Sequence, residues 1–315
     1  MAKRSVGTAQ TSLQKVWADL LSAVTPALIL ALTACGSGQE AEEEKSYPQP
    51  NPLFYELANS DGEVEGWLLG TIHALPEGVV WRTPEIQRVV DEADLLLVEV
   101  AGLGQTAKIR RTFLELSQSP GLSPIEERVS SKLQHEAEAI VSQSNFSRAH
   151  LRTTEDWAAA IMLSQVDAPG EPKYGVDRTV ISNFEGRPVL GFESAESQLS
   201  IFDQLAPDDQ LRLLEGTIEA WSSAKDNPER LLRAWLTGNT QVLEAATIEG
   251  IMADGELRSA LLVNRNADWM RQLVPILDAK PKPLIAVGAA HLVGPDGLVI
   301  MLEDNGYTVT RRSAS

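Results

Sequence analysis

The chain has 315 residues, of which 43% are apolar and 23% are charged, so it can bury a substantial core in one large domain or two small ones. Its formal net charge is −17 and no basic cluster stands out in its body, so the phosphate backbone of a nucleic acid would be repelled. We therefore expect no nucleic acid among its partners.

The N-terminal segment has the order of features found in a secretion signal. Three basic residues precede an apolar stretch, Leu20–Leu32, that is too short to span a bilayer comfortably. The letters LTAC then end at Cys35, the only cysteine of the chain, and resemble the lipobox at which bacterial lipoproteins are cleaved and lipidated. We predict a signal peptide over residues 1–34 and a lipid anchor on Cys35; the alternative is an ordinary buried thiol.

The predicted anchor bears on location and on metal chemistry. Gly36 and Ser37 give no aspartate retention signal, which favours the outer membrane if the cell is Gram-negative. With Cys35 acylated, no thiol remains, so any bound metal would need His, Asp or Glu ligands. Residues 35–52 are small, acidic and contain proline, so we predict a flexible tether there and a single domain over residues 53–315.

From Leu53 onward the chain alternates between strand-like and helix-like patterns. The runs LFYEL and VEGWLLGTI flank the turn-rich ANSDG, which predicts an antiparallel hairpin. The next segment has Thr83 as an N-cap, Pro84 at the first helical position and apolar residues along one face, which predicts a helix. It leads into DLLLVEV, an apolar run typical of a strand buried on both faces, so we expect a βαβ unit.

The middle of the chain is predicted to be mainly helical. Apolar residues recur at helical spacing over Gln105–Leu116, Ser130–Ser144 and Thr154–Gln165. The run RPVLGFE has strand character, and Ser197–Leu277 is a further helical stretch that proline and glycine interrupt. The last segments, PLIAVGAAH, GLVIMLEDNG and YTVTRR, predict strand, helix and strand. The fold class is therefore α/β, with a central, mainly parallel β-sheet, flanking helices and helical insertions.

Four predicted strands each carry one ionisable residue at or near the carboxyl end: His73, Glu99, Glu193 and His291. The carboxyl ends of parallel strands meet at one edge of an open α/β sheet, where ligands bind. Each histidine also follows a glycine by three residues, and a glycine lets the backbone or a ligand approach closely. We therefore predict one shared site. Its two imidazoles and two carboxylates suit a divalent transition metal such as Mn, Fe, Co or Zn, and they also suffice for metal-free acid/base chemistry.

Each of these residues also has a purely structural interpretation. A histidine at a strand end can simply be a polar residue of the rim. Glu99 lies in an apolar strand, where an unpaired carboxylate would cost several kcal/mol, so it is either a site residue or half of a buried salt bridge. Glu193 precedes the letters SAES and can equally belong to the exposed start of a helix.

Several stretches of the chain form a set: GTIH, the apolar strand with Glu99, YGVDR (Tyr174–Arg178), GFESAESQL, NRN followed by Trp269, and VGAAHLVGPDGLVIMLEDNGYTV. Together they resemble the TraB/GumN family, which includes the Tiki proteins. The resemblance extends from Leu53 to about Arg311. It implies an α/β fold related to erythromycin-esterase-like and haem-binding lipoprotein domains.

The resemblance to the Tiki branch also implies a function. That branch performs metal-dependent proteolysis with two GxxH histidines and a glutamate, so the metal ligands here would be His73, His291 and Glu99. We predict a metal-dependent hydrolase, in particular a peptidase, that uses divalent Mn, Co, Fe or Zn and acts on a peptide or small-molecule substrate at the cell envelope. The alternative is a non-catalytic lipoprotein that binds haem or a metal ion through the same histidines.

Further polar residues complete the predicted site. The candidates for catalytic roles are Glu99, Glu193, Asp177, Arg178, Arg265 and Asn266. Asp177 and Arg178 belong to the YGVDR stretch, but they would also suit the start of a helix. Arg265 and Asn266 belong to the NRN stretch and would either bind a substrate carboxylate or bridge helices.

Overall fold

The structure is a computed structural model that describes residues 46–279 and 281–313. The predicted signal peptide, the lipid anchor on Cys35 and the tether up to residue 45 lie outside the described residues. Within the described part, no helix combines the length and the apolar composition that crossing a membrane requires. The predicted domain is described almost completely.

In the described part of the chain, six strands form one sheet in the order β4-β3-β5-β2-β1-β6. The strands are β1 (Phe54–Ala58), β2 (Val64–Thr71), β3 (Leu95–Val100), β4 (Val189–Glu193), β5 (Pro283–Gly288) and β6 (Thr308–Arg311). The strands β4, β3, β5 and β2 run parallel, whereas β1 is antiparallel to both β2 and β6. The predicted α/β class with a mainly parallel sheet is confirmed.

The first predicted elements form as expected, with one difference in topology. Strands β1 and β2 make the predicted antiparallel hairpin. Helix α2 (Pro84–Glu92) begins at Thr83, whose hydroxyl accepts a hydrogen bond from the Ile86 amide at 3.2 Å. This helix connects β2 to the parallel strand β3, but β5 from the end of the chain lies between them. The two halves of the sequence therefore interleave in the centre of the sheet.

The remaining helices are α3 (Thr106–Leu116), α4 (Ile125–Arg128), α5 (Gln134–Gln143), α6 (Arg148–Leu151), α7 (Asp156–Leu163), α8 (Val176–Asn183), α9 (Ala195–Asp203), α10 (Pro207–Ala224), α11 (Arg230–Thr237), α12 (Thr240–Ala245), α13 (Gly255–Arg258), α14 (Asn264–Asp278) and α15 (Leu298–Asp304). Helix α10 begins at a proline and α11 ends at Gly238, which has a positive φ of 63°. The predicted interruptions of the long helical stretch therefore form helix boundaries.

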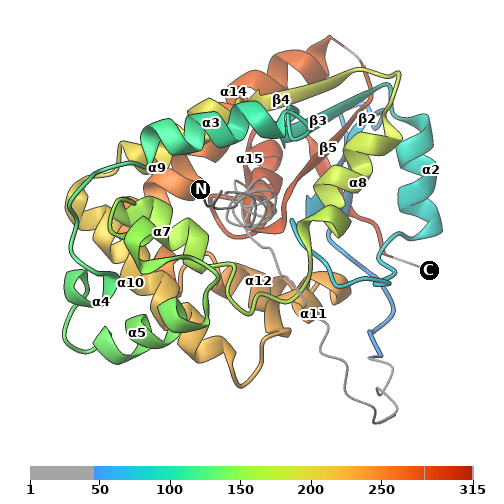
Figure 1. The fold of residues 1–315 in the computed structure, drawn as a ribbon. Helices are drawn as coiled ribbons and strands as arrows, with labels where there is room; N and C mark the ends of the chain where they lie inside the picture. Colours follow the sequence, from blue (N-terminus) through green and yellow to red (C-terminus); the bar gives the residue numbers. More distant parts are fainter. Residues whose placement is uncertain (1–45, 280, 314–315) are drawn as a thin grey trace, which may run out of the picture.

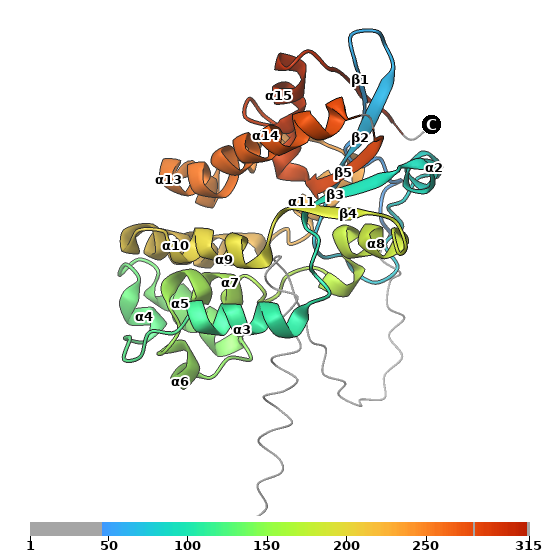
Figure 2. The same ribbon diagram turned by 90° about the horizontal axis from the view of Figure 1, so that it is seen from above.

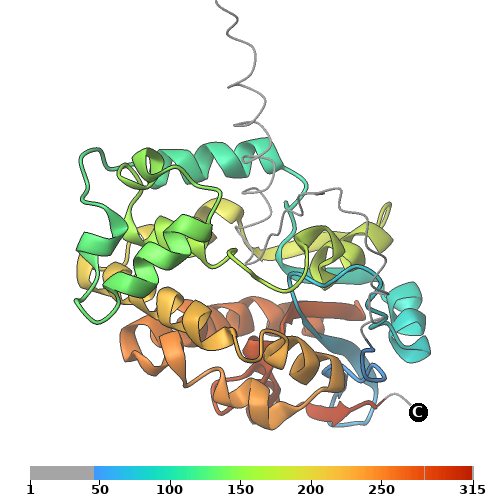
Figure 3. The ribbon, with the colours of Figure 1, turned by 60° about the horizontal axis from the view of Figure 1, so that its bottom comes forward.

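The described part has two clusters of buried apolar side chains. One surrounds the sheet, in which every residue of β3 and of β5 is buried. The other lies among the helices and includes Trp157 of α7 and Leu214 of α10. In Figure 1 the helices α4, α5, α7 and α10 lie to the left of the strands, and Figure 3 shows the same division. Figure 2 shows α14 and α15 on one side of β3 and β4, with α8 on the other.

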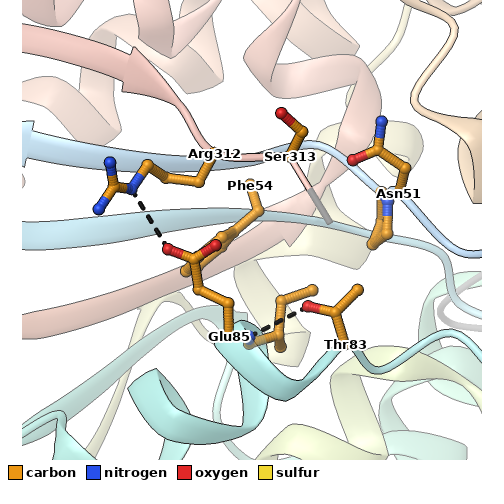
Figure 4. Close-up of a pocket in the computed structure, with 8 residues that line it drawn as sticks. Asn51, Phe54, Thr83, Glu85, Arg312 and Ser313 are labelled. Carbon is orange, nitrogen blue, oxygen red and sulfur yellow. Dashed lines mark hydrogen bonds and ion pairs between the residues drawn. The ribbon is translucent and has the colours of Figure 1, made fainter. Parts of the chain in front are cut away.

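A shallow pocket lies where the C-terminal strand meets the hairpin and α2. Its lining includes Asn51, Thr83 and Arg312 (Figure 4). Arg312 joins the hairpin to α2. Its amide donates to the Phe54 carbonyl at 2.8 Å, and its Nε lies 3.3 Å from Glu85 Oε1. This pocket contains none of the predicted site residues.

Candidate active site

The two glycine-histidine motifs lie side by side on neighbouring strands. His73 follows β2, and His291 lies in a short 3-10 helix, Ala289–Leu292, directly after β5. These strands are parallel, and Thr71 is opposite Gly288 in the register. A Cβ at Gly288 would lie 3.0 Å from Glu99 Oε1 and 3.7 Å from His73 Nε2. A side chain at this position would therefore crowd the space between Glu99 and the two histidines.

Glu99 is a buried carboxylate that accepts three hydrogen bonds. Its Oε1 accepts from the amide of Gly288 at 2.9 Å. Its Oε2 accepts from Arg265 Nη2 at 2.8 Å and from Gln198 Nε2 at 3.3 Å. Burial raises the pKa of Glu99. The neighbouring His291, Arg265 and His73 and the Gly288 amide lower it by more than burial raises it, so the net pKa lies well below its usual range. Glu99 is thus ionised and half of a buried salt bridge, which was one of the two expectations for it.

Glu193 ends β4 and turns its side chain into the site. It receives two hydrogen bonds from Arg265, Nε to Oε1 at 2.8 Å and Nη2 to Oε2 at 2.9 Å. Trp269 Nε1 also donates to Oε1 at 2.9 Å. The exposed N-cap of α9 is the next residue, Ser194. Glu193 is therefore a partner of the site arginine.

Arg265 lies at the centre of the cluster. Besides the two carboxylates, it contacts the second histidine, with Nη1 at 3.2 Å from His291 Nε2. Because a guanidinium only donates, Nε2 of His291 accepts this hydrogen bond. Nη1 also donates to the Leu261 carbonyl at 3.1 Å, and the guanidinium lies over the Trp269 ring at 4.8 Å. A π-helical turn, Ser259–Val263, immediately precedes the helix that carries Arg265, as is common near functional sites.

His73 is held by a carboxylate from α8. Its Nδ1 lies 2.7 Å from Asp177 Oδ2, and the hydroxyl of Thr71 donates to Asp177 Oδ1 at 2.6 Å. Burial alone would lower the pKa of His73. The charge and hydrogen bond of Asp177, with a contribution from Glu99, outweigh burial and raise the pKa from 6.5 to about 9. At neutral pH His73 is therefore an imidazolium, and its Nε2 makes no hydrogen bond to any described residue.

His291 is held by an amide from α14. Its Nδ1 donates to Asn266 Oδ1 at 2.6 Å, and Asn266 Nδ2 donates to the carbonyls of Asp296 at 2.7 Å and of His291 at 3.2 Å, which fixes the orientation of the amide. Burial lowers the pKa of His291 to about 3; Glu99 opposes this effect, and Arg265 and His73 add to it. His291 is neutral, with its proton on Nδ1.

The structure thus brings together all four predicted strand-end residues. Of the other candidates, Asp177, Arg265 and Asn266 contact them directly, whereas Arg178 makes one long hydrogen bond, from Nη1 to the Leu103 carbonyl at 3.4 Å. Sequence reasoning missed Thr71 and Gln198. Thr71 lies inside the GTIH motif, so the motif itself contained that signal, but Gln198 lies in a helix and has no comparable pattern around it.

His73, His291 and Glu99 are residue types that suit a metal ion, but their present arrangement does not. Each histidine has Nδ1 bonded to an acceptor, the arrangement that orients Nε2 of metal-binding histidines toward the ion. However, among the described residues no group of three or more His, Cys, Asp or Glu side chains is placed to hold a metal ion. In addition, Arg265 Nη1 donates a hydrogen bond to Nε2 of His291, the nitrogen that a metal would need.

The fold and this buried ionic centre define an α/β protein whose candidate site lies at the carboxyl edge of a mainly parallel sheet. The chain belongs to the TraB/PrgY/gumN family, whose family model matches residues 55–311. Searches among curated proteins and among solved structures gave no match. The family is the one that the sequence motifs predicted. The relation to erythromycin-esterase-like and haem-binding lipoprotein domains stays a prediction.

Proposed function

We propose that this protein is a metal-assisted hydrolase, in particular a peptidase, held at the cell envelope by a lipid on Cys35. One observation carries the proposal. Two histidines from neighbouring parallel strands, each oriented through Nδ1, flank an ionised glutamate at the edge of the sheet where ligands bind. A divalent Mn, Co, Fe or Zn ion suits nitrogen and carboxylate donors of this kind.

His73 and His291 would hold the ion through Nε2, with Glu99 as the third ligand. When bound, the metal would polarise the scissile carbonyl and lower the pKa of a water molecule. The low pKa of Glu99 favours a ligand role over a general-base role, because a carboxylate that already accepts three hydrogen bonds is a weak base. Asp177 and Asn266 keep the two imidazoles oriented.

A second candidate is hydrolysis without a metal, which the His73–Asp177 pair favours. His73 Nε2 faces the site, and its proton is available for transfer because the pKa is about 9. At neutral pH His73 would donate a proton to a leaving group, and it would act as a base only as the pH approaches 9. The five N–H groups of Arg265 are already engaged by Glu99, Glu193, His291 and the Leu261 carbonyl, so it would act on a negatively charged carbonyl oxygen through its positive charge.

Metal analysis of the purified mature protein, followed by peptide-library cleavage with and without a chelator, separates these candidates from a carrier. Cleavage that a chelator abolishes and metal restores supports the metal-assisted hydrolase. Cleavage that survives the chelator supports the metal-free site. Stoichiometric binding of metal or haem without turnover would establish the carrier.

Histidine variants link the activity to the site. We expect His73→Ala and His291→Ala each to lose metal binding and at least 100-fold in cleavage rate, since each would remove one ligand. His135→Ala is the matched control, because this exposed histidine lies in α5, outside the site. Normal metal content in both site variants would refute the assignment of ligands.

The membrane anchor has its own test. Intact-mass analysis of the mature protein should find acyl chains on a chain that begins at Cys35, and Cys35→Ser should remain an unprocessed precursor without lipid. A mature protein without acyl chains would refute lipid anchoring and leave the catalytic proposal untouched.

A further inference from the structure

We infer that the guanidinium of Arg265 occupies the position of the metal in the metal-free site, and that a metal enters only when Arg265 releases His291 and Glu99. This inference rests on the proposed use of a metal. It concerns one residue, Arg265, and makes it a competitor of the ion as well as a partner of the two carboxylates.

His291 has a single lone pair that a metal could use, at Nε2. Asn266 holds Nδ1 at 2.6 Å, so Nε2 is the only nitrogen of this ring that can bind a metal. Arg265 Nη1 donates to that same nitrogen at 3.2 Å. One lone pair cannot accept a hydrogen bond and coordinate a metal at the same time. Metal binding and the present contact of Arg265 therefore exclude each other.

The charges of the site also couple Arg265 to the metal. Glu99 is buried and the side chain of Glu193 is 11% exposed, and Arg265 lies 2.8 Å from an oxygen of each. Moving this cation away without a replacement would leave Glu99 buried and unpaired, which is costly. A divalent ion beside Glu99 would replace the lost positive charge. The exchange is therefore favourable only together with metal binding.

Arg265 also has contacts that it can keep after it releases His291 and Glu99. Its Nε and Nη2 both bond to Glu193, and its guanidinium lies over the Trp269 ring. Neither Glu193 nor Trp269 is among the three predicted metal ligands, although Nη2 also donates to Glu99 and would have to give up that hydrogen bond. A rotation of the guanidinium about its Glu193 contacts would free His291 and Glu99 while the arginine stays paired. Glu193 is then the residue that retains Arg265 when the ion is bound.

The inference is tested by measuring Co²⁺ and Zn²⁺ affinity calorimetrically in the full mature protein. We expect Arg265→Gln to bind at least tenfold more tightly than the wild type. Arg128→Gln is the matched control, because the side chain of Arg128 is 9% exposed, close to the 12% of Arg265, and pairs with a carboxylate outside the site, Asp156 at 2.8 Å. Its affinity should equal that of the wild type.

Arg265→Lys separates blocking from simple charge repulsion. It keeps the positive charge, but a single ammonium nitrogen cannot span His291, Glu99 and Glu193 together. Affinity close to that of Arg265→Gln supports blocking, whereas affinity equal to the wild type overturns it. In the wild type itself, the guanidinium NMR signals of Arg265 should shift on Zn²⁺ addition while those of Arg128 stay, and unchanged Arg265 signals with bound metal would also overturn the inference.

The result also distinguishes this inference from the proposed function. If the wild type binds metal and neither Arg265 variant binds more tightly, the competition is wrong while metal use stands. If no form of the protein binds metal, the metal-assisted function fails and the inference fails with it.

Discussion

The two glycine-histidine motifs share one pattern and one strand geometry, yet their histidines differ in charge. The side chain of His73 is 19% exposed, and its imidazole has a pKa of about 9. The side chain of His291 is 7% exposed, and its imidazole has a pKa of about 3. The partner of Nδ1 is a carboxylate in one motif and an amide in the other. The motif therefore determines where a histidine lies, and a residue from elsewhere in the chain determines its protonation.

The two motifs keep the same geometry although the partners of their histidines differ in charge. Both partners accept a hydrogen bond at Nδ1, so both rings direct Nε2 into the site. Only His73 holds a second proton at neutral pH, because Asp177 supplies a negative charge and Asn266 does not. The site thus has one transferable proton on one side and a neutral nitrogen, covered by Arg265, on the other.

The largest effect is expected from Asn266→Asp, which gives His291 a carboxylate partner like the Asp177 partner of His73. Asn266 is fully buried, and its amide nitrogen donates to two carbonyl oxygens. A carboxylate oxygen in its place would be repelled by both, so we expect the free energy of unfolding to fall by about 3 to 5 kcal/mol. Urea unfolding measures the loss, with the exposed Asn305→Asp as control. A loss below about 1 kcal/mol would contradict the proposed role of this amide.

The converse change, Asp177→Asn, should discharge His73. Burial then acts without an opposing carboxylate at Nδ1, so the pKa of His73 should fall from about 9 to below 6.5, a change of more than about two units or roughly 3 kcal/mol. NMR titration of the imidazole in chelator-treated protein measures it. Thr71→Val removes only the hydroxyl that bonds to Asp177 and should leave the pKa of His73 above 6.5. An unchanged pKa in Asp177→Asn would show that another group charges His73.

The two histidines should also give opposite dependences of stability on pH in the metal-free protein. The raised pKa of His73 stabilises the fold fully below 6.5, and this stabilisation is lost as the pH rises through about 9. The lowered pKa of His291 has the reverse sign, so its contribution is complete above 6.5 and is lost as the pH falls toward 3.

Differences between the wild type and single variants isolate each contribution. The stability advantage of the wild type over His73→Gln should shrink by about 2.5 kcal/mol between pH 6.5 and 9. Its advantage over His291→Gln should shrink between pH 6.5 and 4.5. Denaturant unfolding at several pH values measures both. Equal slopes for the two variants would mean that the histidines are electrostatically alike.

Sequence patterns predicted which residues meet at this site better than they predicted the order of the strands that carry them. Four apolar runs, each with an ionisable residue at or near its carboxyl end, predicted that His73, Glu99, Glu193 and His291 meet at one edge of the sheet, because parallel strands share that edge. The insertion of β5 between β2 and β3 was not predicted, since strand order depends on long-range packing that no local pattern specifies.

The central role of Arg265 was equally hidden in the sequence. Its NRN motif indicated a polar contact, but α14 alone does not show which of several acidic residues it reaches. Three groups from three other elements converge on its guanidinium, namely Glu99, Glu193 and His291. Only the packed structure brings them within hydrogen-bond distance, and it also explains why the three predicted ligands do not form a ready metal site.

The smallest expected effect is the release of one proton when a metal binds. It tests whether only His73, and not His291, is charged before the metal binds. His73 carries a proton on Nε2 below about pH 9 that coordination must displace, whereas His291 Nε2 carries none. Metal affinity should therefore rise about tenfold per pH unit, roughly 1.4 kcal/mol, between pH 6.5 and 9 and level off above. Calorimetry in buffers of different ionisation enthalpy should count about one proton at pH 7 in the wild type and close to none in Asp177→Asn, whose His73 is already neutral. Two protons released by the wild type would mean that both histidines are charged before binding, and none would mean that His73 is not a ligand.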